Sequence, residues 1–125
     1  MEVFEDEARR KAAELDKKYR KNPQSAGRLF GAVISLKDVI CYEGHEVSAA
    51  ATILREFTSL FSATAVERIL AEDAIIIGRT NCDQFAMGSD NTNSIYGPTL
   101  NADDQTLVPG GSSGGSAVAV QADTC

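Results

Sequence analysis

The stretch PGGSSGGS occupies residues 109–116 and runs directly into the apolar residues AVAV at positions 117–120. Four glycines flank the adjacent serines Ser112 and Ser113, and a third serine, Ser116, precedes the apolar run. Glycine tolerates backbone angles that other residues avoid and lets a backbone approach a ligand closely. Together with free N–H groups at the start of a helix, the two hydroxyls would stabilise negative charge. We therefore interpret this loop as half of an active site.

Two apolar runs upstream of the loop predict buried strands. The first is GAVISL at residues 31–36, and the second is AIIIG at residues 74–78, which lacks the polar alternation of a half-exposed strand. A helix is predicted between them over residues 64–72, opened by a capping box of Thr64 and Glu67. Strand, helix and strand in this order predict an α/β fold with a largely buried sheet.

The remaining segments predict further helices and a long loop. Apolar residues at spacings of three and four favour a helix over residues 2–21. A short helix is expected within residues 49–57, and a short capped turn of helix within residues 81–88. Residues 89–106 are rich in Asn, Ser, Asp and Gly and are expected to form a loop. A buried helix is expected from residue 114 to residue 122.

Composition excludes several classes of protein. The 125 residues fall within the size of one domain, and the net charge of −6 disfavours a nucleic-acid footprint. No apolar run is long enough to span a bilayer, and the first residues do not resemble a signal peptide. Three widely spaced cysteines indicate reduced thiols in the cytosol. The one histidine, His45, lies in a polar turn and is expected at the surface, and we predict no metal site.

Two familiar serine or glycine motifs fit the loop poorly. Residues 110–115 match G-x-x-x-x-G, but Ser116 stands where a phosphate loop needs lysine. Ser112 and Ser113 each fit G-x-S-x-G, but Pro109 precedes the glycines and no histidine follows them. The nucleotide-binding and nucleophile-elbow interpretations are therefore both weak.

A serine can also be activated by a lysine. Lys37 ends the first predicted strand, and burial favours the neutral amine that can serve as a base. On local grounds, however, Lys37 could equally pair with Asp38 or extend into solvent. Met87 and Phe85 could line a substrate pocket or pack in a core, and the residues alone leave both uses open.

Four stretches together resemble the amidase signature family. They are ISLKD (34–38), IGRTNCDQFAMGS (77–89), NSIYGPT (93–99) and PGGSSGGSAVAV (109–120). The resemblance is greatest to the glutaminase subunits of tRNA-dependent amidotransferases. It implies a mixed sheet covered by helices on both faces, of which residues 1–125 would be an incomplete part, a partial amidase domain cut at both ends.

The resemblance also implies a Ser–cis-Ser–Lys triad. Lys37 matches the family's lysine, and Ser112 matches its bridging serine, which follows a cis peptide bond after Gly111. Ser113, Gly110 and Gly111 are expected to support the network, and Met87 is a candidate for substrate binding. The family carries its nucleophile in a second glycine–serine motif, and no such motif follows Ser112 in these residues.

The activity implied by the resemblance is hydrolysis of glutamine through an acyl-enzyme. The ammonia would convert Glu-tRNA(Gln) to Gln-tRNA(Gln) in a cytoplasmic complex with subunits B and C. ATP, magnesium and most tRNA contacts would belong to a partner subunit, and no cofactor or membrane contact is expected for this chain. Two alternatives stay open: another amide hydrolase of the family, and a non-catalytic truncated product, since the nucleophile of the triad is missing.

Overall fold

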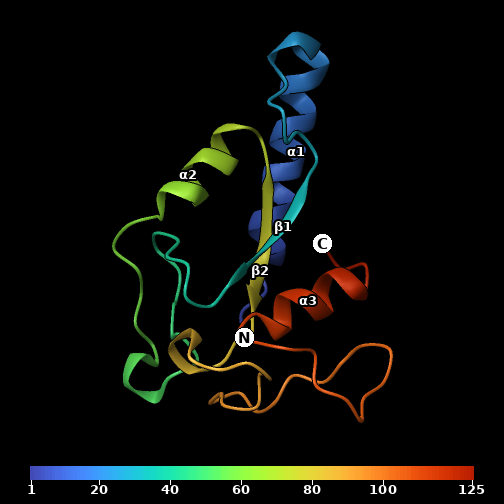
Figure 1. Cartoon of the computed structure of the whole chain (residues 1–125). Coiled ribbons are helices and arrows are strands. Elements are labelled where there is room, and N and C mark those ends of the chain that lie inside the picture. The colour runs from blue at the N-terminus through green and yellow to red at the C-terminus, as the bar shows by residue number, and fades with distance from the viewer.

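The two apolar runs form the strands β1 (Val33–Lys37) and β2 (Ile75–Thr80), which pair in parallel (Figure 1). The computed structural model describes all residues from 1 to 125. An irregularity between Ile34 and Ser35 shifts the register of the pair. Both strands end at one edge of the sheet, where Lys37 lies opposite Thr80. The predicted α/β class is thus confirmed.

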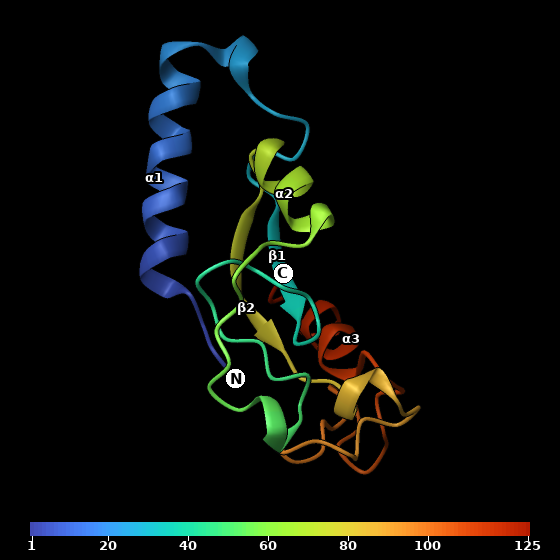
Figure 2. The same ribbon diagram turned by 90° about the vertical axis from the view of Figure 1, so that its left-hand side faces the viewer.

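Helix α1 (Glu5–Lys21) covers one face of this small sheet (Figure 2). Its buried residues Ala8 and Leu15 pack in one apolar cluster with Ile75 of β2. The helix begins three residues later than its apolar pattern predicts. Residues 2–4 instead run beside β2, because their backbone groups form hydrogen bonds with the edge of that strand.

Helix α2 (Thr64–Ala71) covers the opposite face (Figure 2). Its most buried side chain, Val66, joins an apolar cluster with Phe4, Leu36 and Ile76. Coverage on both faces explains why β2 lacks polar alternation. The predicted capping box is wrong, because Thr64 is already helical, Ala63 holds the cap position, and no side chain caps the helix.

The predicted helix within residues 49–57 is mostly absent, and only a 3-10 turn forms at Thr52–Leu54. Ala49 and Ala50 have φ angles of 50° and 52°, and both donate backbone hydrogen bonds to Asp38. This long-range attachment overrides the local helical preference. Two more 3-10 turns form at Pro23–Ser25 and at Gln84–Ala86, the latter without the side-chain cap that the sequence predicts.

The long loop of residues 89–106 is confirmed, since it contains no helix or strand. It leads through the serine loop into α3 (Gly114–Gln121), at the edge of the sheet where the strands end (Figure 1). The expected burial of this helix is wrong: only Gly114 is buried, and Val120 is 64% exposed. Helix α3 packs against the strands β1 and β2. None of the helices combines the length and the apolarity that crossing a membrane requires.

Candidate active site

The side chain of Lys37 joins the end of β1 to the serine loop. Its Nζ donates hydrogen bonds to Ser112 Oγ at 2.6 Å and to Ser113 Oγ at 2.8 Å. Lys37 therefore neither pairs with Asp38 nor simply extends into solvent. The structure brings together an amine and two hydroxyls that are 75 residues or more apart in the chain.

The backbone of the serine loop presents both hydroxyls to the amine. Gly110 has a φ of +82°, in the left-handed region that favours glycine, and the Gly111–Ser112 peptide is cis, as the resemblance implied. One turn further on, Ser116 Oγ lies 2.8 Å from Thr80 Oγ1. Lys37 and Thr80, the last residues of β1 and β2, lie opposite each other in the sheet. Each of them thus contacts a serine within residues 109–116.

The N–H groups at the start of α3 are less available than the sequence suggested. The Gly115 N–H donates to the Asn81 carbonyl at 3.1 Å and to Asn91 Oδ1 at 3.0 Å. The Ser116 N–H donates to the Ser113 carbonyl at 3.0 Å. The expectation that N–H groups at the start of α3 are free to stabilise a negative charge is therefore wrong for Gly115 and Ser116, whose N–H groups already have acceptors.

Three buried or half-buried polar residues that sequence reasoning passed over hold the serine loop in place: Asn81, Asp83 and Asn91. Asn81 and Asn91 bind the start of α3, and the Asp83 N–H donates to the Ser112 carbonyl at 3.1 Å. Asn81 and Asp83 had a signal in the sequence, since both come shortly after a buried strand. Side chains at the carboxyl ends of parallel strands commonly form the site of an α/β protein.

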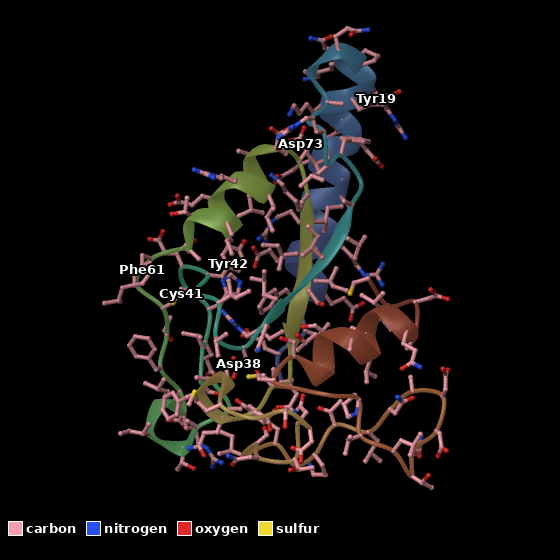
Figure 3. All side chains as sticks on the ribbon, viewed as in Figure 1. Tyr19, Asp38, Cys41, Tyr42, Phe61 and Asp73 are labelled. Carbon is pink, nitrogen blue, oxygen red and sulfur yellow. The ribbon has the colours of Figure 1, made fainter.

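Asp38 lies just beyond the end of β1 (Figure 3) and is almost fully buried. Its carboxylate accepts hydrogen bonds from the Ser48 hydroxyl and from the backbone N–H groups of Ser48 and Ala50. Arg79 Nη1 lies 3.9 Å from Asp38 Oδ1, and burial lowers the pKa of Arg79 although the charge of Asp38 opposes that change. Asp38 thus fixes the turn that follows β1 rather than neutralising Lys37.

His45 was expected at the surface, but its side chain is only 16% exposed. It stacks on Tyr42 with ring centroids 4.0 Å apart, and its Nε2 lies 2.8 Å from Glu7 Oε2 of α1. The tyrosine hydroxyl also donates to Glu7. These contacts attach the turn at residues 42–45 to α1, away from Lys37.

Within residues 1–125, no pocket encloses the contact of Lys37 with Ser112 and Ser113. Met87 is 79% exposed at the end of its 3-10 turn, so nothing here encloses it in a pocket, and its part in substrate binding stays a prediction. Four cavities of about 250 to 300 Å³ occur in the chain, and none is lined by Lys37, Ser112 or Ser113. Additional protein surface would be needed to surround a substrate at the amine.

The structure is an α/β frame in which the strand-end Lys37 contacts two hydroxyls of a glycine–serine loop that contains a cis peptide. The sequence profile of the Amidase family matches residues 1–125, so the chain belongs to that family. Among curated relatives, it is 52% identical over 123 residues to the A subunit of glutamyl-tRNA(Gln) amidotransferase from Chlorobaculum parvum. It is also 52% identical over 121 residues to the protein of the same name from Chlorobaculum tepidum.

The alignments cover 98% and 97% of this chain but 25% of each relative, so the chain spans about a quarter of their length. The structure is also similar to the solved protein of that name from Thermotoga maritima, with 32% identity, a TM-score of 0.75, and coverage of 94% of this chain and 29% of that one. Similarity to a peptide amidase from Stenotrophomonas maltophilia gives 34% identity, a TM-score of 0.81, and coverage of 94% and 25%. The fold is therefore part of the amidase-signature fold.

Proposed function

We propose that residues 1–125 form the lysine-bearing part of a glutamine-hydrolysing amidotransferase subunit. The contact of Lys37 with Ser112 and Ser113 carries this proposal, because it places a base beside the bridging hydroxyl that the chemistry needs. The 52% identity to two amidotransferase relatives favours glutamine over other amides as the substrate, with its ammonia used for tRNA-dependent amidation. The nucleophile would come from a second glycine–serine motif, which these residues do not contain.

In the proposed reaction, the nucleophilic serine oxygen bonds to the carboxamide carbon of glutamine. Its proton passes to Ser112, and the Ser112 proton passes to the neutral amine of Lys37. When the tetrahedral intermediate collapses, the C–N bond breaks and Lys37 returns a proton through Ser112 to the leaving ammonia. Ser113 holds the amine in place, and water then releases glutamate from the acyl-enzyme.

The ammonia would be consumed by a partner that amidates glutamate on Glu-tRNA(Gln) to give Gln-tRNA(Gln). Subunits B and C are the proposed partners, and ATP, magnesium and most tRNA contacts are assigned to the partner. The net charge of −6 supports this division, because a chain that bound tRNA by itself would be expected to be basic. A cytoplasmic location follows from the same role.

The proposal is tested by measuring glutamine hydrolysis. The protein assayed is the complete product of the reading frame, which includes any coding sequence that continues before or after residues 1–125. Lys37→Ala and Ser112→Ala should each lower kcat by about 100- to 10,000-fold while the fold survives. Lys17→Ala, a change at an exposed lysine of α1, should leave kcat unaltered. Near-normal turnover in either site variant would refute the triad assignment.

A different amide substrate is the second candidate, and the similarity to the peptide amidase structure, with a TM-score of 0.81, favours testing it. Profiling the complete product against glutamine, peptide amides and other primary amides separates the two candidates. Turnover of peptide amides with no turnover of glutamine would replace the glutaminase assignment. No turnover of any amide would favour a non-catalytic product.

A further inference from the structure

We propose that Asp83 is a positioning residue that sets the place of Ser112 in the reaction, an inference that rests on the proposed function. Asp83 follows the end of β2 by three residues, and none of its surface is exposed. Its carboxylate forms no ion pair. Burial of a carboxylate without a counter-ion is costly, so packing alone gives little reason for an aspartate at this position.

The carboxylate is held by the backbone of the polar loop. Its Oδ2 accepts from the Asn91 N–H at 3.0 Å, and its Oδ1 accepts from the Asn93 N–H at 3.4 Å. Gly88 packs against it so closely that an added Cβ would lie 2.3 Å from the carboxyl carbon of Asp83. One side chain therefore fixes the course of residues 88–93.

The same residue also contacts the serine loop at two points. An added Cβ on Gly111 would lie 2.3 Å from Asp83 Oδ2, so the carboxylate packs directly against the residue before Ser112. The Asp83 N–H donates to the Ser112 carbonyl at 3.1 Å. The peptide that carries Ser112 is thus held from both of its ends by Asp83.

This support matters because proton transfer depends on distance. Ser112 Oγ lies 2.6 Å from Lys37 Nζ, and a displacement of about 1 Å would cost roughly 100-fold in rate. Asp83 is wholly buried behind the loop and cannot touch a substrate. It therefore acts through Ser112, and it should affect the turnover number more than the binding of glutamine.

Asp83→Asn in the complete product tests the inference, because the amide keeps the shape but turns an N–H donor toward one of the two backbone donors. We expect kcat to fall by about 10- to 100-fold, with the KM for glutamine within about twofold of wild type. Asp104→Asn is the matched control: Asp104 binds the backbone and hydroxyl of Thr106 in its own exposed turn, and kcat should stay within about twofold.

A double-mutant cycle separates positioning from general destabilisation. In a Ser112→Ala background, Asp83→Asn should lower the residual kcat by less than about twofold, because the group it positions is gone. A merely structural role would lower activity by the same factor in both backgrounds, and that result would overturn the inference. A folded Asp83→Asn enzyme with at least half of the wild-type kcat would also overturn it.

If Asp83→Asn does not fold, Gly88→Ala provides the second test, because its new methyl group would displace the carboxylate from the side of the polar loop. We expect the same fall in kcat with an unchanged KM, and a folded variant with normal kcat would overturn the inference. Failure of the proposed function is distinguishable, because the wild-type product would then hydrolyse no glutamine. The two variants would in that case be assayed on whichever amide the wild type hydrolyses.

Discussion

Replacing Gly111 by alanine should disable the site without removing any of its polar groups. The new Cβ would lie 2.3 Å from Asp83 Oδ2, 2.6 Å from the Asp90 nitrogen and 2.7 Å from the Ser89 carbonyl carbon. An ordinary contact begins at 3.4 Å, so the carboxylate contact alone requires a movement of about 1.1 Å. Two of the three neighbours are backbone atoms and cannot rotate away, so the loop that carries Ser112 must move.

Such a movement lengthens the contact between amine and hydroxyl. If it points away from Lys37, the 2.6 Å separation of Nζ and Ser112 Oγ grows to about 3.7 Å, beyond the range of a hydrogen bond. A misplacement of this size costs roughly 100-fold in kcat, which corresponds to about 2.7 kcal/mol in the activation barrier.

The assay is glutamine turnover by the complete product, normalised to the concentration of folded protein. Gly44→Ala is the control for a glycine-to-alanine change without a steric clash: an added Cβ there meets nothing within 4 Å, and the only strain comes from its own positive φ of 77°. That control should lose about 1 kcal/mol of stability and keep its kcat. A folded Gly111→Ala enzyme with at least half of the wild-type kcat would refute the reasoning.

Three further predictions concern the stability of the 125-residue chain, measured by urea denaturation. Val66→Ala removes two methyl groups from a side chain that is 1% exposed, and it should lower the free energy of unfolding by about 2 kcal/mol. Burial and the hydrogen bond to Glu7 raise the pKa of Tyr42 to about 12, so its contribution is complete below pH 10 and is lost as the pH rises to 12. Tyr42→Phe should flatten that decline, and an equally steep decline would contradict the assignment. Hydrogen bonds from Lys18 and the Gly27 backbone lower the pKa of Asp73, so their contribution is present above about pH 4 and is lost on acidification. Lys18→Met should weaken this acid dependence, and an unchanged acid slope would count against it.

The parts of the fold that the sequence predicted well are those set by local pattern. The apolar stripe of α1, the unbroken apolar run of β2 and the polar loop of residues 89–106 each depend on burial or on turn residues. The capping box at Thr64 and the helix within residues 49–57 failed, because backbone groups distant in sequence hold the chain there: the Ala63 N–H donates to the Cys41 carbonyl and the Ala49 N–H to the Asp38 carbonyl.

For the site too, local pattern predicted some features and missed those that depend on distant contacts. Glycine and serine chemistry marked the loop, but local reasoning left Lys37 free to pair with Asp38 or reach solvent. Only the resemblance joined it to Ser112, because a contact across 75 residues leaves no periodic signal. Asp83 was missed for a related reason: its packing against Gly88 and Gly111 joins segments 5 and 28 residues away along the chain.

The surface of the whole chain is larger than that of a typical folded monomer of its mass. A folded monomer of 13.3 kDa typically exposes roughly 6,450 Å². This chain exposes 7476 Å², an excess of about 1,000 Å². One partner in a standard protein interface buries about 800 Å². The chain as a whole therefore leaves uncovered about the area that one partner buries in a standard interface, and a protein surface placed over the serine loop would exclude water from Lys37 and its two hydroxyls.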